Sequence, residues 1–218
     1  MAKSFYDQDL KSEGLRRTFN AKSNDELCDL YNKWADTYEQ ELNSYGWNAP
    51  SQIALMMEKY VQDRKAPIFE IGIGPGNLGA FLRFELGYEV IDGVDISAKM
   101  VELSRRRGVF RNFFTEDCSK GYTFLGNLQY KAVFLCGVFC RGHLDASWLY
   151  HIAPYVEKGG YLIFTCSPAN YVERNVAEHF EKLRSTYTLI DKSEIFKGFE
   201  HESEKPDNQI FVLEKILF

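Results

Sequence analysis

The segment APIFEIGIGPGNLGAFL, residues 66–82, constrains the fold of this chain more than any other. Its apolar run, 67–71, is typical of a buried strand, and glycines follow at positions 72, 74, 76 and 79, where an apolar-periodic segment begins. This order predicts a strand, a tight turn and a helix. Closely spaced glycines let a ligand approach the backbone, and the start of a helix offers unpaired N–H groups. The segment therefore predicts a binding site for a nucleotide-like cofactor.

Length and composition indicate one sizeable α/β domain. The chain has 218 residues, of which 45% are hydrophobic and 26% charged, as is ordinary for a soluble globular protein. No apolar run approaches the roughly 18 residues of a membrane helix, and the polar N-terminus has no signal-peptide core. We therefore expect a cytoplasmic protein with no membrane partner. The net charge of −5 argues against a nucleic-acid partner.

The cysteine pattern predicts reduced thiols and no metal site. The five cysteines are odd in number and scattered along the chain, unlike a disulfide framework. Cys136 and Cys140 form a C-x3-C pair, but no second pair of cysteines or histidines completes a zinc set.

Apolar and glycine patterns divide the chain into strands and helices. We expect partial order over residues 1–22, followed by two helices before the first strand. The expected strands cover residues 67–72, 88–94, 109–114, 130–136, 161–166, 187–190 and 209–218, and the expected helices cover residues 23–42, 50–63, 77–86, 97–107, 145–153 and a segment capped by Asn170. Five β–α alternations predict a parallel sheet with helices on both faces. The last two strands have no helix between them, which predicts an antiparallel pair at one edge.

Two cofactor classes fit the glycines in two frames. Residues 74–79, GPGNLG, satisfy G-x-G-x-x-G, and Asp95 follows at the spacing of a dinucleotide fingerprint. Residues 70–76 read E-x-G-x-G-x-G, which resembles the first motif of class I S-adenosylmethionine-dependent methyltransferases. Three features favour the second frame: Glu70 lies within the strand, the terminal strands are antiparallel, and no residues remain for a separate substrate domain.

The resemblance extends from about residue 28 to the end of the chain and implies S-adenosyl-L-methionine as the cofactor. It implies a Rossmann-like methyltransferase sheet of seven strands with an antiparallel final strand, helices on both faces and an N-terminal helical cap. We expect residues 1–64 to form this cap over the cofactor site and residues 65–218 to form the cofactor-binding core, together one compact domain. The implied cofactor-binding residues in the core are Glu70, Gly72, Gly74, Gly76, Asp95, Ile96, Met100, Asp117, Cys118 and Gly137, whereas Gly79 is assigned to helix packing.

The resemblance also assigns roles to several of these residues. In the family, the acidic residue that closes the second strand, here Asp95 in GVDIS, binds both ribose hydroxyls, and Asp117 with the backbone of Cys118 matches the adenine site. Glu70 orders the loop or reaches the ammonium group of the cofactor. Alternatives remain open: Asp95 as a helix cap, Met100 as a core residue and Asp117 as a solvated acid.

The expected N-terminal helix carries a second motif, YNKWADTYEQ, residues 31–40. It resembles a signature of small-molecule methyltransferases of the ubiquinone/menaquinone type, and, together with GVDIS and GVF, the Williams-Beuren syndrome chromosome-region methyltransferase-like proteins. Asn32 replaces an acid of that signature. The resemblance implies that Trp34 and Tyr38 cover the cofactor, and aromatic core packing is the alternative.

These motifs predict methyl transfer by in-line displacement to a small, partly apolar acceptor. His143 is the candidate general base, although Arg141 and Gly142 are inserted before it relative to the family pattern. Arg141 is a candidate for binding an anionic group, and Phe139 and Tyr171 are candidates for apolar contact with the acceptor. The alternatives are a catalytically silent cofactor-binding partner protein of the same fold and an NAD-dependent oxidoreductase.

Overall fold

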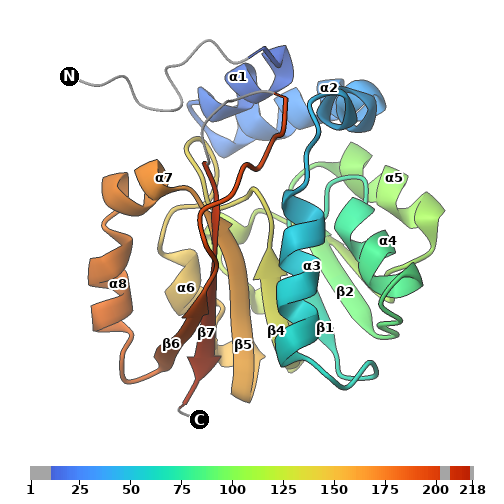
Figure 1. Ribbon diagram of the computed structural model, residues 1–218. Helices are drawn as coiled ribbons and strands as arrows, with labels where there is room; N and C mark the ends of the chain where they lie inside the picture. The colour runs from blue at the N-terminus through green and yellow to red at the C-terminus, as the bar shows by residue number, and fades with distance from the viewer. Residues whose placement is uncertain (1–10, 202–206, 217–218) are drawn as a thin grey trace.

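The computed structural model describes residues 11–201 and 207–216, which form a single seven-stranded sheet with helices on both sides (Figure 1). The order of strands across the sheet is β3-β2-β1-β4-β5-β7-β6. β1 to β5 pair in parallel, and β7 is antiparallel to both of its neighbours. The strands are β1 (Ile68–Ile71), β2 (Ile91–Asp95), β3 (Asn112–Thr115), β4 (Tyr130–Leu135), β5 (Val156–Cys166), β6 (Tyr187–Lys192) and β7 (Gln209–Lys215). The predicted sheet and its antiparallel edge are confirmed.

Side chains of the central strands alternate between two hydrophobic layers. In β4, Ala132 and Phe134 belong to the layer under α3 (Ala49–Tyr60) and α4 (Asn77–Phe84). Val133 and Leu135 belong to the opposite layer, with α6 (Trp148–His151) and α8 (Val176–Lys182). These four side chains are fully buried, which explains the apolar run of residues 132–135 within β4. The remaining core helices are α5 (Ala98–Arg107), α7 (Pro168–Glu173) and three short 3-10 turns (Cys118–Lys120, Thr123–Leu125 and Ala153–Tyr155).

The expected partial order before residue 23 is wrong for the part that the structure describes, because α1 (Glu13–Phe19) forms there. Ser12 Oγ accepts a hydrogen bond from Leu15 N (3.1 Å) and donates one to Glu41 of α2 (2.6 Å). So short a helix is marginal alone and depends on such packing. α2 (Asn24–Ser44) begins as predicted, with Ser23 as its N-cap. Residues 1–10 lie outside the described part.

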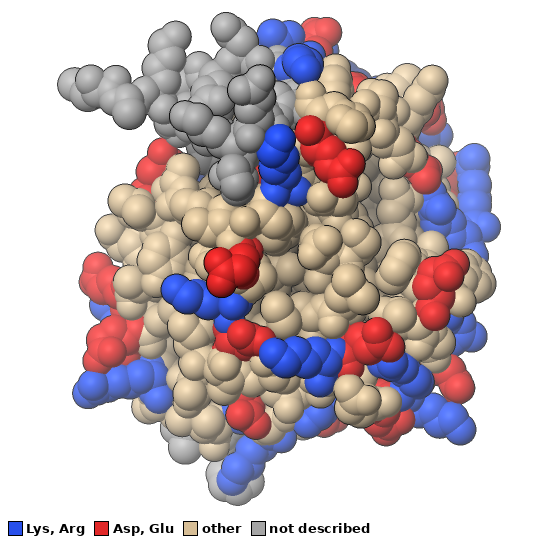
Figure 2. All heavy atoms as spheres, viewed as in Figure 1, with Lys and Arg blue, Asp and Glu red and all other residues tan. Residues whose placement is uncertain are grey.

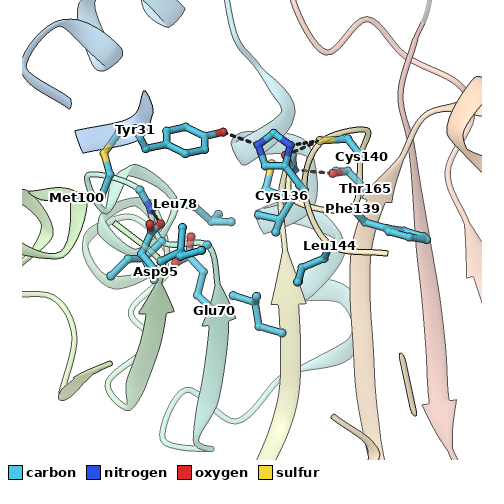
Figure 3. A pocket seen from close by; sticks show the side chains of 18 of the residues that line it. Tyr31, Glu70, Leu78, Asp95, Met100, Cys136, Phe139, Cys140, Leu144 and Thr165 are labelled. Atoms are coloured by element: carbon cyan, nitrogen blue, oxygen red, sulfur yellow. Dashed lines mark hydrogen bonds between the residues drawn. The ribbon is translucent and has the colours of Figure 1, made fainter. Parts of the chain in front are cut away.

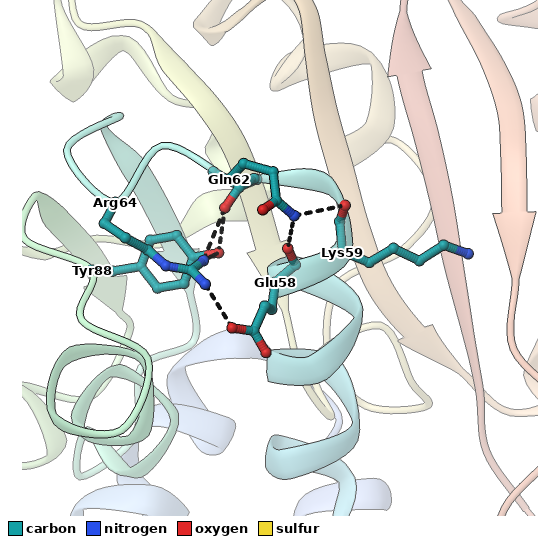
Figure 4. Close-up of polar contacts among 6 residues, drawn as sticks. Glu58, Lys59, Gln62, Arg64 and Tyr88 are labelled. Carbon is teal, nitrogen blue, oxygen red and sulfur yellow. Dashed lines mark hydrogen bonds and ion pairs between the residues drawn. The ribbon is translucent and has the colours of Figure 1, made fainter.

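The structure places α3 with the core, although the predicted cap extends to residue 64. α3 packs against α4 and β5. Beyond its C-terminus, Arg64 donates to the Val61 carbonyl (3.1 Å) and the Tyr88 hydroxyl (2.6 Å) and pairs with Glu58 (2.6 Å), as Figure 4 shows. These bonds tie the end of α3 to the segment before β2. The cap over the sheet edge is therefore α1 and α2 (Figure 1).

The loop between β6 and β7 reaches the segment that joins α2 to α3, beside the cap (Figure 1). Gly198 O accepts a hydrogen bond from Asn48 N (3.0 Å), and Phe199 stacks on Trp47 at 6.1 Å between ring centroids. Most of the segment HESEKPDN, residues 201–208 between the last two strands, lies outside the described residues. Among the described helices, none combines the length and apolar character needed to cross a membrane. One cap differs from prediction: Ser167, not Asn170, caps α7, while Asn170 donates to Phe139 O (2.7 Å).

Candidate active site

A cavity opens at the carboxyl ends of β1, β2 and β4, beneath α1 and α2. Ligands bind at this edge of open α/β sheets because the loops there converge. Many residues singled out from the sequence line it (Figure 3), namely Tyr38, Glu70, Gly72, Gly74, Asp95, Ile96, Met100, Asp117, Cys118, Gly137, Phe139 and His143. The structure thus brings together residues from five separate segments of the chain.

The glycines after β1 have different local surroundings. Gly72, Gly74 and Gly76 all have positive φ, at 75°, 50° and 89°, a region that side chains disfavour. A Cβ atom on Gly72 would lie 2.3 Å from Val138, and one on Gly76 would lie 2.7 Å from Ser104 Oγ. A Cβ atom on Gly74 would meet only Tyr38, at 4.0 Å. Gly74 is therefore the position where the backbone is bare toward the cavity, whereas Gly76 packs on α5 and does not line it.

Asp95 ties the glycine loop to the start of α5. Its Oδ2 accepts from Gly74 N and its Oδ1 from Ser97 N, both at 2.8 Å. Burial raises the pKa of this carboxyl to about 6, although the two backbone bonds act in the opposite direction. Ser97 Oγ itself caps α5 by accepting from Met100 N (3.1 Å), so helix capping alone does not account for Asp95.

Glu70 is a buried acid with an unused oxygen. Its side chain lies at the cavity wall, the residue is 2% exposed, and Oε2 has no hydrogen-bond partner in the described structure. Burial, and secondly the nearby Asp95, raise its pKa well above the usual range. Unpaired buried polar atoms are rare and demand an explanation. A cationic or hydrogen-bond-donating ligand group in the cavity would supply the missing partner.

Asp117 links the cap to the loop after β3. It accepts hydrogen bonds from the Asn24 side chain (3.0 Å) and from Ser119 N (3.0 Å). Burial favours the protonated form, but the bonds from Ser119 and Asn24 outweigh it and lower the pKa of Asp117. The acid is therefore ionised and held in place at the cavity rim, with Cys118 buried beside it.

His143 faces the cavity from the loop after β4. Its Nε2 lies 2.7 Å from Tyr31 Oη of α2 (Figure 3), and its Nδ1 lies 3.0 Å from Arg141 O. Burial, with a smaller contribution from the Arg174 charge, lowers the pKa of His143 to about 4, against the effect of the Arg141 carbonyl. At neutral pH the ring is uncharged.

Several solved structures with a similar architecture are described as methyltransferases. A DhpI complex with S-adenosyl-L-homocysteine has a TM-score of 0.64 and is 17% identical, covering 88% of this chain and 96% of that one. A TehB-like S-adenosylmethionine-dependent methyltransferase from Corynebacterium glutamicum gives 0.63 and 16%, covering 86% and 99%. Magnesium protoporphyrin IX methyltransferase from Synechocystis, with S-adenosyl-L-homocysteine bound, gives 0.61 and 15%, covering 89% and 99%. No protein-family model and no curated protein matches the sequence.

This chain has the class I methyltransferase fold. The likeness covers the sheet with its antiparallel final strands and the surrounding helices.

Besides Gly76, three residues predicted to contact ligands lie outside the cavity lining in this methyltransferase fold. Trp34 is buried in the cap, where it donates to Glu41 (2.7 Å) and packs against Gly14. Tyr171 stacks on Phe211 at 5.3 Å on the α8 side of the sheet. Arg141 contributes its carbonyl to His143 but does not line the cavity. Trp34 therefore follows the alternative of aromatic packing, and no lining guanidinium is available from Arg141.

Several lining residues were missed by sequence reasoning. Thr165 Oγ1 accepts from Gly137 N (2.8 Å) and so fixes the loop after β4. Apolar lining from distant segments was also missed, namely Leu15, Phe19, Leu144 and Phe199. Leu15 and Phe19 lie in a helix too short to show periodicity, and Phe199 belongs to a connection whose position depends on tertiary contacts. Of these residues, only Thr165 could have been found from the sequence, because it lies at the end of a predicted strand.

Proposed function

We propose that this protein is an S-adenosylmethionine-dependent methyltransferase acting on a small, partly apolar acceptor. The observation that carries the proposal is the pair of buried carboxyls, Glu70 and Asp95, facing one cavity beside the bare backbone of Gly74. The methyltransferase fold of the solved structures supports it.

The lining suits each part of the proposed donor. S-adenosyl-L-methionine supplies a methyl group on a sulfonium cation that is already activated for transfer. Asp95 accepts hydrogen bonds from the ribose hydroxyls, which are worth roughly 1.5–3 kcal/mol each when the acceptor is charged. Glu70 pairs with the ammonium group, and Asp117 lies at the adenine end beside Ile96 and Met100. The unsatisfied Oε2 of Glu70 supports this assignment.

Positioning is the main catalytic task that remains for the protein. Alignment of reacting groups supplies roughly 7–11 kcal/mol, against roughly 3–5 kcal/mol for a general base. The cap, α1 and α2, excludes water from the methyl group, and the loop after β4 brings the acceptor into line.

The acceptor is a small molecule rather than a nucleic acid. Figure 2 shows Lys and Arg interspersed with Asp and Glu on the face it draws, unlike the concentrated basic surface that phosphate backbones require. An NAD-dependent oxidoreductase is disfavoured by the antiparallel final strands. A catalytically silent cofactor-binding partner would keep the Asp95 site and turn over no acceptor.

We also infer kinship with the ubiquinone/menaquinone-type and Williams-Beuren-type proteins, and Asn32 supports it despite replacing an acid. Asn32 Oδ1 accepts hydrogen bonds from Ser97 Oγ (2.7 Å) and Lys99 N (3.2 Å) at the start of α5. A carboxylate oxygen would accept the same two bonds, so the substitution preserves the contact between cap and core.

Binding of S-adenosyl-L-homocysteine should weaken as the pH falls through about 6. Asp95 has a pKa of about 6, and only its ionised form accepts both ribose hydroxyls, so a proton must leave before the ligand binds. We expect affinity about tenfold lower at pH 5 than at pH 7.5, since one pH unit below a pKa leaves about a tenth of the group ionised. Calorimetry across this range measures the change.

Two variants serve as controls for this titration. Asp95→Asn keeps Glu70, the other carboxyl with a raised pKa, and should remove the part of the pH dependence that comes from Asp95. Asp95→Ala should bind at least about tenfold more weakly at pH 7.5, because the ribose bonds are lost. Affinity of Asp95→Ala equal to that of the parent would show the ribose assignment to be wrong.

A further inference from the structure

The hydrogen bonds around His143 fix the direction of the bond from Tyr31. Arg141 O is a carbonyl and only accepts, so His143 Nδ1 must carry the proton that bonds to it at 3.0 Å. The Cys140 thiol, 3.3 Å from the same nitrogen, donates its own hydrogen to Gly137 O. His143 Nε2 is therefore an acceptor, and Tyr31 Oη donates to it at 2.7 Å.

This arrangement makes the Tyr31 oxygen an acceptor toward the cavity. Its only hydrogen is committed to His143, and Tyr31 lines the cavity. The neighbouring Thr18 hydroxyl directs its own hydrogen to Gly14 O and Leu15 O (both 3.1 Å), so a lone pair of the Tyr31 oxygen is left for a ligand. Burial raises its pKa well above the usual range, so the phenol is not ionised. A ligand group next to Tyr31 Oη gains a hydrogen bond only if it brings a hydrogen of its own.

The charged residues that line the cavity also limit which acceptors can bind. Among the described residues that line it, no Lys or Arg occurs, whereas five are acidic: Glu70, Asp95, Glu116, Asp117 and Asp207. The Arg174 guanidinium, which bonds to the loop after β4, is held by Asn170 Oδ1 (2.7 Å) and Cys140 O (2.8 Å) and does not line the cavity. An anionic acceptor would meet the ionised Asp117 and no cation among these residues, so nothing would replace its hydration.

We propose that the methyl acceptor is a neutral, largely apolar molecule whose nucleophilic atom is a hydroxyl or a neutral amine, and that Tyr31 accepts the hydrogen bond that orients it. The apolar side chains of Leu15, Phe19 and Leu144 line the same cavity and contact the body of the molecule. This inference rests on the proposed function. Tyr31 is the residue that touches the acceptor, and His143 is a positioning residue that acts through Tyr31.

Tyr31 and His143 also provide a route for the proton that leaves the acceptor. As the bond from the methyl carbon to oxygen or nitrogen forms and its bond to sulfur breaks, the acceptor hydrogen passes to Tyr31 Oη and the Tyr31 hydrogen passes to His143 Nε2. The sulfonium charge is lost and one proton is gained by His143, so the charge balances. The low pKa of His143 returns that proton to water when the cavity opens.

Four probes with the same apolar body test the acceptor class: 4-butylphenol, 4-butylaniline, 4-butylanisole and 4-butylbenzoate. Their binding to the protein saturated with S-adenosyl-L-homocysteine is measured by calorimetry at about pH 7.5. We expect the phenol or the aniline to bind at least about tenfold more tightly than the benzoate and fivefold more tightly than the anisole, which lacks the hydrogen. Equal or tighter binding of the benzoate, or binding of none of the four, would overturn the inference. Failure to bind S-adenosyl-L-homocysteine would instead reject the proposed function.

Variants separate a direct contact of Tyr31 from a structural role. In Tyr31→Phe the advantage of the phenol over the anisole should vanish, while affinity for the anisole stays within about twofold. His143→Gln, which keeps an acceptor for the Tyr31 hydroxyl, should preserve the advantage, and His143→Leu should lose it. The chain offers a matched control in Tyr150, which bonds to His179 Nδ1 at 2.9 Å and does not line the cavity. Tyr150→Phe should change nothing, and an equal loss there would overturn the assignment.

Discussion

Leucine in place of Gly74 should abolish detectable binding of S-adenosyl-L-homocysteine while the protein remains folded. The bare backbone of Gly74 faces the cavity, and a Cβ atom added there would have only Tyr38 nearby, at 4.0 Å. A leucine side chain would therefore extend into the space that the ligand requires. Calorimetry at ligand concentrations up to about a hundredfold above the parent dissociation constant measures the loss.

Gly87 provides the matched control for this substitution. Its φ of 77° is also positive, and a Cβ atom there meets nothing within 4 Å. Leucine at either position carries a similar backbone strain of about 1–2 kcal/mol. Gly87→Leu should lower the melting temperature by about as much as Gly74→Leu does. It should bind the ligand as tightly as the parent protein does. Normal binding by Gly74→Leu would contradict the placement of the ligand.

Removal of the Asp92 carboxylate should have the largest effect on stability. Asp92 is fully buried in β2, where it accepts from Arg111 Nε (2.9 Å), Asn112 N (3.0 Å) and the Tyr130 hydroxyl (2.9 Å). Asp92→Ala leaves these donors without their acceptor, at a cost of about 3 kcal/mol. This corresponds to a fall in melting temperature of roughly 6–12 °C, measured by thermal unfolding.

Asp191→Ala is the control for Asp92→Ala, because it measures the loss of stability when only an ion pair near the surface is removed. Asp191 accepts from Lys59 (2.7 Å) and Tyr60 (2.6 Å) near the protein surface, so Asp191→Ala should cost no more than about 1 kcal/mol. If Asp92→Ala were no less stable than Asp191→Ala, the structural role assigned to Asp92 would be wrong. Asp92 and Asp95 lie three residues apart in one strand, and we expect the first to support the fold and the second the ligand.

The sheet was predictable because its strands are short apolar runs separated by glycines and polar turns. Glu70, Gly74 and Asp95 were predictable for a related reason, since each lies at or beside a strand end, where chain order determines position. The 3-10 turn after Asp117 also follows from such local chemistry, because its side chain accepts from Ser119 N.

The remaining parts depend on contacts between distant segments. α1 is short and forms against α2 through Ser12 and Gly14. Phe199 reaches the cavity because backbone bonds join its loop to the segment around Trp47. Arg141 lies outside the cavity lining, in the turn before His143 where Gly142 has a φ of 79°. None of these contacts has a periodic signature.

The bond between Tyr31 and His143 illustrates the same limit at the site. Both residues were visible in the sequence, one within an aromatic stripe and the other as a candidate base. Their separation of 112 positions hid the fact that one orients the other. With its pKa lowered to about 4, His143 is a weaker base than the sequence indicated, and its neutral ring accepts the hydrogen bond of a phenol.

Calorimetry with S-adenosyl-L-methionine, S-adenosyl-L-homocysteine and NAD in parallel tests the central claim most directly. The two sulfur nucleosides should bind with one site per chain, and NAD should give no measurable heat of binding, because the cavity is lined by carboxylates and by no described Lys or Arg that would receive a pyrophosphate. Binding of NAD without binding of either sulfur nucleoside would contradict the methyltransferase account.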